Sequence, residues 1–423
     1  MNMSYEEARA YLEQISRTGS IYGLDTIRAL MAELGNPEQQ ARVIHIAGTN
    51  GKGSILTYTA NILKAAGYTV GTYTSPAVMG YEERYQINCE WMDQKELPEL
   101  VETVRAAAEA SVSKGNAMPT VFKFETAIAF VYFAKKNCDF VILETGLGGD
   151  LDSTNVVDFT EVCAFASISL DHTAILGSTL AEIAGHKAGI IKPGSAVVIG
   201  WQEPEVEQIL TQCAASQGSE ILRIDREGLE ETGLMEFDYK WHKGLQIKLL
   251  GKHQIENAAV AVEIADYLAI SEDAITEGLA MSKWPGRFEI ITRDGEPPVI
   301  IDGAHNPDAA KRLAEGLDRY FNGRRIYAVI GMFKDKACDE VATILAPYLA
   351  GGYSIDLPDA NRRISKEELA DMYISKGIDV AEMYSIEEAI EEASEDARRN
   401  NGIVLITGSL SYLAEAKSCL EAE

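Results

Sequence analysis

The segment from residue 43 to residue 67 restricts the possible fold more than any other part of the chain. Its apolar run Val-Ile-His-Ile-Ala at 43–47 has the composition of a buried strand and leads directly into Gly-Thr-Asn-Gly-Lys-Gly-Ser at 48–54. A helix-length segment follows and ends near Gly67. This order places backbone N–H groups at a helix N-terminus, where they bind phosphate oxygens. The segment therefore predicts a nucleotide-phosphate site in an α/β domain.

Within this glycine-rich loop, Lys52 is expected to bind the β- and γ-phosphates, and the Ser54 hydroxyl a divalent cation. We also assign the other loop residues to nucleotide binding: Thr49, Asn50, Gly51 and Gly53. The loop departs from G-x-x-x-x-G-K-[ST], because Ile46 stands at the first glycine and a glycine separates the lysine from the serine. The alternative interpretation is an ordinary glycine-rich turn between a strand and a helix.

Apolar runs alternate with amphipathic, helix-length segments along the chain, which is typical of a parallel sheet covered by helices. In the first part, the strand-like runs lie at 43–47, 68–73, 140–143, 162–168 and 196–199. Residues 220–250 are more polar and predict antiparallel strands at the edge of the first domain. A second series begins near residue 298, with runs at 299–301, 326–330 and 403–406.

These patterns predict two α/β domains. The first is a P-loop-type ATPase domain with a mostly parallel sheet, and the second is a smaller, Rossmann-like C-terminal domain. Pro and Gly in Trp284-Pro285-Gly286-Arg287 break the preceding helix. We therefore expect domains of residues 1–286 and 287–423.

The charge of the chain argues against several classes of protein. With 65 acidic and 38 basic side chains, its net charge is −27, which repels nucleic acid and anionic membrane surfaces. The first residues carry acids where a secretory signal is basic and apolar, and no apolar run is long enough to span a membrane. The six cysteines lack metal-binding spacing. We therefore expect a cytoplasmic protein that binds neither nucleic acid nor membranes.

Two polar residues follow strand-like runs near the loop. Glu144 ends the run 140–143, at the position where a nucleotide-bound Mg²⁺ needs an oxygen ligand. His172 follows the run 162–168, but a histidine alone is more often structural, and Mg²⁺ prefers oxygen. A polar strand end and a structural histidine are the alternatives.

Several motifs resemble one known family. Gly-Thr-Asn-Gly-Lys-Gly-Ser resembles the ATP loop of the Mur ligase superfamily, and its spelling resembles the folylpolyglutamate synthase and dihydrofolate synthase branch. Further motifs follow in the family's order: G-K-H-Q-I-E-N-A-A at 251–259, W-P-G-R-F-E at 284–289 and D-G-A-H-N-P at 302–307. The motifs extend from residue 43 to about residue 413, which is nearly the whole chain.

The resemblance implies a metal site with four ligating residues: Ser54, Glu144, His172 and Lys187. In this site, the ε-nitrogen of Lys187 is carbamylated, so that it carries a carboxylate that helps to hold a second metal ion. The alternative is a plain lysine paired with phosphate. The implied cofactors are ATP and Mg²⁺ at two sites, with K⁺ as a further cation.

The resemblance also assigns residues outside the loop. Asn257 contacts the nucleotide, although a buried helix-capping amide is the alternative. Arg287 and Asp302 complete the ATP site. Arg287 lies at a hinge, and its guanidinium neutralises phosphate after the C-terminal domain has closed. The implied catalytic residues are Lys52, Lys187 and His305. The implied substrate-binding residues are Ser75, Pro76, Arg84, Phe124, Glu125 and His305.

Three departures from the family's pattern stand near these residues. Ala77 and Val78 follow Ser75-Pro76 where the family commonly has His-Leu. Asp150 occupies a position often filled by Arg, and Ser411 is inserted in a C-terminal motif.

The implied function is an ATP-dependent carboxylate–amine ligase. ATP phosphorylates a folate or pteroate carboxylate, and the amine of L-glutamate attacks the acyl phosphate. The acceptor is tetrahydrofolate, dihydropteroate or both, and the altered 74–77 loop favours folate. The resemblance suggests a monomer. One alternative is a regulatory P-loop ATPase without ligase activity. Another is a cell-wall Mur ligase, but the 47 residues before Gly48 are too few for a UDP-binding domain.

Overall fold

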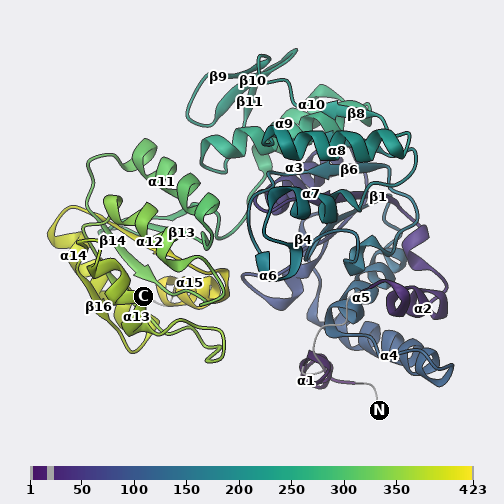
Figure 1. Ribbon diagram of the computed structural model, residues 1–423, viewed down its shortest axis with the longest axis horizontal. Helices are drawn as coiled ribbons and strands as arrows, with labels where there is room; N and C mark the ends of the chain where they lie inside the picture. Colours follow the sequence, from purple (N-terminus) through teal and green to yellow (C-terminus); the bar gives the residue numbers. More distant parts are fainter. Residues whose placement is uncertain (1–2, 17–22, 422–423) are drawn as a thin grey trace. The chain divides into compact units, whose positions relative to one another are not determined.

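The computed structural model describes residues 3–16 and 23–421, and the chain divides into two compact units (Figure 1). The first unit is composed of Met1–Ala77, Tyr81–Lys248 and Ile255–Ser282. The second is composed of Val78–Gly80, Leu249–Gln254 and Lys283–Glu423. Each unit contains its own sheet and its own hydrophobic core.

The first unit is built on an eight-stranded sheet in the order β4-β3-β2-β5-β1-β6-β7-β8. Six of its strands are parallel: β1 (Arg42–Ala47), β2 (Val70–Tyr73), β5 (Phe140–Glu144), β6 (Val162–Phe165), β7 (Ala196–Ile199) and β8 (Ile221–Arg223). The antiparallel strands β3 (Tyr85–Ile87) and β4 (Glu90–Trp91) form one edge. The mostly parallel sheet confirms the predicted fold class.

Helices cover both faces of this sheet, since alternate side chains of each strand point to opposite faces. One face packs on α1 (Tyr5–Ser16), α2 (Asp25–Glu33), α4 (Leu97–Ser113), α5 (Val121–Lys135), α7 (Leu180–Ala188) and α8 (Pro204–Ser216). The short α6 (Thr173–Leu176) packs beside α7. The other face packs on α3 (Lys52–Ala65) and α9 (Lys252–Tyr267), and α10 (Glu272–Met281) lies against α3.

The segment 220–250 differs in part from the prediction. Strands β9 (Leu229–Glu231), β10 (Glu236–Tyr239) and β11 (His242–Gln246) are antiparallel, as expected, but they form a separate three-stranded sheet. The prediction was wrong for β8, which pairs parallel to β7 at the sheet edge. The physical reason is that α8 connects β7 to β8, and such a crossover returns the chain in the same direction.

The second unit is a smaller α/β fold with a six-stranded sheet in the order β12-β13-β17-β14-β15-β16. Its parallel strands are β13 (Val299–Asp302), β14 (Ile326–Ile330), β15 (Gly351–Ser354), β16 (Val380–Glu382) and β17 (Ile403–Thr407). The edge strand β12 (Glu289–Ile291) is antiparallel. One face packs on α11 (Pro307–Phe321), α12 (Cys338–Leu345) and α13 (Lys366–Ile374), and the other on α14 (Ile386–Arg399) and α15 (Leu413–Glu421).

The chain also contains short 3₁₀ helices: η1 (Pro37–Gln39), η2 (Tyr81–Arg84), η3 (Gln94–Glu96), η4 (Ser153–Val156), η5 (Ala346–Tyr348) and η6 (Leu410–Tyr412). Across residues 3–16 and 23–421, we find no helix with the length and apolar character that crossing a membrane requires. All six cysteines are free thiols.

Candidate functional site

The glycine-rich loop connects β1 to the start of α3, as predicted. Gly51 precedes the helix in a left-handed conformation, with a φ of 94°. The loop is fixed to the segment after β6, because the Thr49 N–H donates to the Ser167 carbonyl at 2.8 Å. The Thr49 hydroxyl also donates to the Ser169 carbonyl at 2.9 Å. These bonds hold the loop in one shape before any ligand arrives.

The start of α3 has the properties of a phosphate site. Gly51 has no side chain, so it does not itself cap the N–H groups of the first turn of α3. Lys52 lies at this helix end, with its Nζ 3.2 Å from the Thr49 carbonyl and 3.8 Å from Glu144 Oε1. Ser54 is buried in the same turn. Helix amides and an ammonium group together suit the phosphates of a nucleotide.

Asn257 contacts this loop from α9. A Cβ built on Gly51 would lie 2.6 Å from Asn257 Oδ1, so the asparagine side chain fills the space that only a glycine leaves open. Asn257 is buried. The structure thus brings this predicted residue to the nucleotide loop, although the sequence places it more than two hundred positions away.

Glu144 and Lys187 also lie beside the loop. Glu144 is the last residue of β5, and it pairs in register with Ile46 of β1, two positions before Gly48. Lys187 is on α7, 5% exposed, and its Nζ donates to the Gly48 carbonyl at 2.8 Å. Burial, followed by the nearby charge of Lys52, lowers the pKa of Lys187 to about 7. This lysine is therefore partly a neutral amine near neutral pH.

Within the described residues, the structure brings together only some of the predicted metal ligands. Oxygen donors suit Mg²⁺, and the Glu144 carboxylate and the buried Ser54 hydroxyl lie next to the phosphate loop. His172 is the residue before α6, half-exposed, with its Nε2 3.9 Å from Asp171 Oδ2. Within residues 3–16 and 23–421, no three His, Cys, Asp or Glu side chains form a metal-binding group. Among the predicted ligands, the oxygen atoms of Ser54 and Glu144 are therefore the ones whose chemistry and position suit Mg²⁺.

A pocket of about 380 Å³ lies in the first unit at the same sheet edge. Its lining includes residues that follow β2 and β5, namely Ser75 and Pro76, and Gly146 and Leu147. Because β2, β5 and β1 are parallel neighbours, their carboxyl ends lie at one edge of the sheet, where β1 leads into the phosphate loop. The predicted substrate residues Ser75, Pro76, Arg84 and Glu125 all line the pocket.

Buried aromatic and charged side chains shape this pocket. Arg84 Nη1 lies 3.5 Å from Glu125 Oε2, and both side chains are largely buried. The Tyr73 ring stacks on Tyr85 at 5.7 Å and on Phe122 at 6.1 Å between centroids. The lining of the pocket therefore combines an aromatic side chain, Phe122, which packs on Tyr73 behind it, with an internal ion pair.

Phe124 is not placed as expected. It is fully buried in the helical core, its ring 5.6 Å from that of Tyr11, and it is not among the described residues that line the pocket. Two residues along a helix turn the side chain by about 200°. Phe122 therefore faces the pocket while Phe124 faces the core.

Sequence reasoning missed Phe122, Lys123 and Asp152, which also line the pocket. Apolar residues occur on every side of α5. Its sequence therefore has no helical periodicity that distinguishes the side facing the pocket from the side facing the core. Asp152 could have been predicted as a pocket residue from its position in the polar turn after the Gly146–Gly149 stretch.

Arg287, Asp302 and His305 belong to the second unit. Asp302 ends β13 and accepts hydrogen bonds from the N–H groups of Phe288 at 2.8 Å and Ala304 at 2.9 Å. Burial raises the pKa of Asp302, and the charge of Arg287 opposes that rise. His305 Nδ1 lies 2.8 Å from the Gly303 carbonyl. Their roles toward the nucleotide of the first unit stay predictions.

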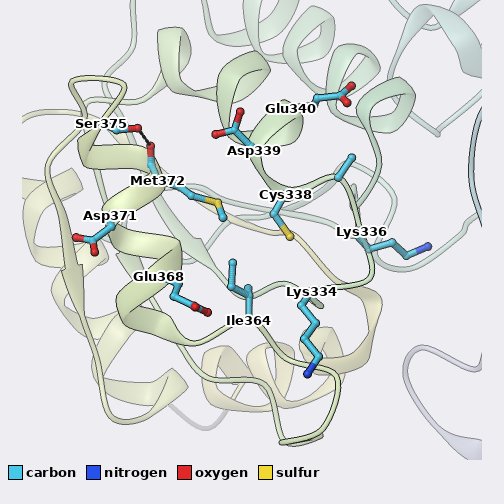
Figure 2. A pocket seen from close by; sticks show the side chains of 11 residues that line it. Lys334, Lys336, Cys338, Asp339, Glu340, Ile364, Glu368, Asp371, Met372 and Ser375 are labelled. Carbon is cyan, nitrogen blue, oxygen red and sulfur yellow. Dashed lines mark hydrogen bonds between the residues drawn. The ribbon is translucent and has the colours of Figure 1, made fainter.

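Another hollow of about 930 Å³ lies in the second unit beside α12 and α13 (Figure 2). Lysines at 334 and 336 and carboxylates at 339, 340, 368 and 371 contribute to its lining. None of the predicted site residues is in this lining. The mixed charge favours no single class of ligand, so the site of interest is the one in the first unit.

Comparison with known proteins decides the family. Residues 46–265 match the Mur ligase middle domain, and residues 286–410 match the Mur ligase glutamate ligase domain. The dihydrofolate synthase/folylpolyglutamate synthase of Bacillus subtilis strain 168 is 35% identical over 439 residues, covering 100% of both chains. The chain belongs to the folylpolyglutamate synthase and dihydrofolate synthase family of Mur ligases.

Solved structures of this family agree with the fold. A folylpolyglutamate synthase from Thermotoga maritima has a TM-score of 0.86 at 33% identity, over 99% of this chain and 96% of that one. Escherichia coli FolC in complex with DHPP and ADP has a TM-score of 0.87 at 30% identity, over 98% of both chains. Both Mur ligase domains match, so a regulatory ATPase, which the loop alone supported, is not favoured.

Proposed function

We propose that the chain is an ATP-dependent carboxylate–amine ligase that adds L-glutamate to a folate. One observation carries this proposal: the phosphate loop after β1 and the pocket after β2 and β5 open at the same edge of one sheet. ATP in the loop and a carboxylic acid in the pocket would therefore meet there. The full-length relationship to enzymes named folylpolyglutamate synthase supports the same reaction.

The reaction proceeds through an acyl phosphate. The substrate carboxylate attacks the γ-phosphorus of ATP, the bond to the bridging oxygen breaks, and ADP leaves. The amine of glutamate then attacks the acyl carbon, forms the amide, loses a proton and releases phosphate. The contribution of the protein to such phosphoryl transfer is positioning and charge neutralisation.

For this reaction, we assign ATP binding to the phosphate loop, Asn257, Arg287 and Asp302. Lys52, which neutralises the transferring phosphate, and His305 are assigned as catalytic residues. We take the domains as residues 1–286 and 287–423. The arrangement of the loop and the Lys52 ammonium supports the nucleotide part of this assignment.

Mg²⁺ at two sites would neutralise charge on the phosphates, with K⁺ as a further cation. Ser54, Glu144, His172 and Lys187 would hold these ions. We include a carbamate on Lys187, which forms when a neutral amine attacks CO₂ and releases a proton. Burial supports this modification, because it lowers the pKa of Lys187 to about 7 and so supplies the neutral amine.

Dihydropteroate is a second acceptor that the family names suggest, since the Bacillus subtilis relative bears both activities in its name. We propose folate as the main acceptor, because the loop after Pro76 departs from the common family pattern. We further propose a monomer in the cytoplasm whose partners are these small molecules.

The test is ADP release by the purified chain with Mg-ATP and L-glutamate, with tetrahydrofolate or dihydropteroate in separate reactions. We expect ADP release that requires both glutamate and tetrahydrofolate. Release with both acceptors would make the enzyme bifunctional. Equal ADP release without glutamate or acceptor would contradict the proposal and support an ATPase.

A further inference from the structure

The pocket of the first unit contains polar donors that find no acceptor in the protein. Ser75 Oγ and Arg84 Nε are both buried, and neither has a hydrogen-bond partner in the described chain. Both residues line the pocket. Buried donors are normally satisfied, and leaving one unpaired destabilises the protein. The missing acceptors are therefore expected to come from a ligand.

Lys123 is a third donor in the same lining. The residue is only 3% exposed, and it lies in the first turn of α5. Across the described residues, its ammonium takes part in no hydrogen bond or ion pair. Burial lowers the pKa of Lys123, and the exposed Asp25 carboxylate offsets this only in part, from a distance. The residue as a whole is covered, but its Nζ is not among the side-chain atoms that are fully shielded from solvent, so a ligand can reach the ammonium. An accessible ammonium without a partner in the described chain is suited to pair with an anion from outside the chain.

The start of α5 adds to the positive character of the pocket. Thr120, the residue before this 15-residue helix, forms no side-chain cap, and Thr120, Val121 and Phe122 line the pocket. The positive end of the helix dipole is therefore not neutralised by a capping side chain. This positive helix end favours a bound anion and disfavours the ammonium of Lys123, which lies in the first turn.

The carboxylates of the pocket are engaged elsewhere. Asp152 accepts hydrogen bonds from the Leu147 N–H at 2.7 Å, the Thr154 N–H at 2.9 Å and the Thr154 hydroxyl at 2.6 Å. Glu125 forms an ion pair with Arg84. Neither carboxylate serves as the counter-ion of Lys123, so the pocket retains an excess of donors.

We propose that Lys123 binds the non-reacting carboxylate of a glutamylated folate and so selects folates over dihydropteroate. This inference rests on the proposed function. Dihydropteroate has one carboxylate, which is the reacting group, whereas a folate has a second carboxylate on its glutamyl end. Phe122, Leu147 and Leu151 supply the apolar wall for the aromatic part of the same substrate.

The test compares two ligands that differ only by the glutamyl group, dihydrofolate and dihydropteroate. Their binding to the full chain is measured by titration calorimetry for the native protein, Lys123→Met and Lys123→Arg. The exposed Lys95 provides the control variant Lys95→Met, which removes one charge outside the pocket. Lys123→Met is expected to weaken dihydrofolate binding about 10- to 100-fold. Dihydropteroate affinity should change less than about twofold, and Lys123→Arg should retain most of the dihydrofolate affinity.

Salt and stability separate this role from a structural one. Raising the salt concentration should weaken dihydrofolate binding to the native protein more than binding to Lys123→Met. The melting temperature of Lys123→Met should not fall, because the variant removes an ammonium that has no partner in the described chain. If that variant does not fold, the same comparison with Lys123→Gln replaces it.

Equal weakening of both ligands by Lys123→Met, or no weakening of either, would overturn the inference. A native protein that binds neither ligand would instead mean that the proposed function has failed. A native protein that binds both ligands, with a variant that does not distinguish them, would leave the ligase function standing and remove only the role of Lys123.

Discussion

Gly51 is the residue on which the shape of the phosphate loop depends most directly. Its φ of 94° is in the left-handed region, and a Cβ there would meet the Asn257 side chain at 2.6 Å. Both the backbone conformation and the contact with α9 therefore require a glycine. The same two features place the start of α3 where its N–H groups are available to phosphate.

Gly51→Ala should therefore reduce both stability and ATP affinity. The left-handed backbone alone costs about 1–2 kcal/mol for a residue with a Cβ, and the contact with Asn257 adds to that cost. Gly194→Ala is the matched control, because Gly194 also has a positive φ, of 75°, but open space around it. Urea unfolding and ATP titration would measure the difference. An ATP affinity equal in the two variants would contradict this account of the loop.

Lys52 is the cation that reaches both the loop and Glu144. Lys52→Ala should lower glutamate-dependent ADP release by about a hundredfold or more, because a charge that stabilises the transferring phosphate is lost. Lys64→Ala, at an exposed position on the same helix, should leave the rate unchanged. Near-normal turnover by Lys52→Ala would show that this loop does not bind the reacting phosphate.

The turn between β5 and η4 fixes the end of the helix that carries Lys187. Asn155 Nδ2 donates to the carbonyls of Asp150 and Gly189, at 3.1 Å each. The Asp150 N–H donates to the His186 carbonyl at 2.9 Å, and the Asp150 carboxylate lies 3.1 Å from His186 Nδ1. Asp150, where the family often has Arg, thus pairs with a neighbour of Lys187.

These contacts predict a difference between two variants. Asn155→Ala removes buried hydrogen bonds and should lower the free energy of unfolding by about 1–3 kcal/mol. Asp150→Ala breaks a half-exposed pair and should cost less than about 1 kcal/mol. Chemical denaturation of both variants measures the two values. A larger loss for Asp150→Ala would mean that the surface pair, rather than the buried amide, holds the end of α7.

Much of this arrangement could be predicted from the sequence, because buried parallel strands have sequences that are short apolar runs. The runs at 196–199 and 326–330 match the ends of β7 and β14. The glycine-rich loop could be placed because a strand, glycines and a lysine in that order are typical of a phosphate-binding turn. Glu144 could be placed because parallel strands end at one edge.

Other features could not be predicted, and the reasons are physical. Helix α5 is apolar all round, so its sequence does not show that Phe122 rather than Phe124 lines the pocket. Lys123 would be expected at the surface, since lysine is almost never fully buried without a partner. The parallel pairing of β8 depends on where the chain returns after α8, which the polar sequence of 220–250 does not encode.

The full chain has a net charge of −27, whereas the anion sites that we propose in its first unit depend on local positive groups. At physiological salt, charges are screened over about 8 Å. The loop amides, Lys52 and the donors of the pocket can therefore attract phosphate and carboxylate despite the overall charge. The buried residues of each hydrophobic cluster come from a single unit, which indicates that each unit has its own stability.

Calorimetry should accordingly show two unfolding transitions rather than one. A non-hydrolysable ATP analogue should stabilise the unit that holds the phosphate loop by mass action and so raise its transition temperature. At a hundredfold excess over the dissociation constant, the free energy of unfolding of that unit should rise by about 2.7 kcal/mol. A separate scan of Lys52→Ala should show a smaller rise. A single transition that the analogue does not move would contradict both the independence of the units and the site.

The most direct test of the ligase reaction follows oxygen atoms. Tetrahydrofolate with ¹⁸O in its glutamyl γ-carboxylate is incubated with the enzyme, Mg-ATP and L-glutamate, and the released phosphate is analysed by mass spectrometry. If the carboxylate is phosphorylated by ATP and then attacked by the amine, each phosphate carries one ¹⁸O from the folate. Phosphate that contains no ¹⁸O, with ATP consumed, would contradict an acyl phosphate intermediate and with it the proposed ligase reaction.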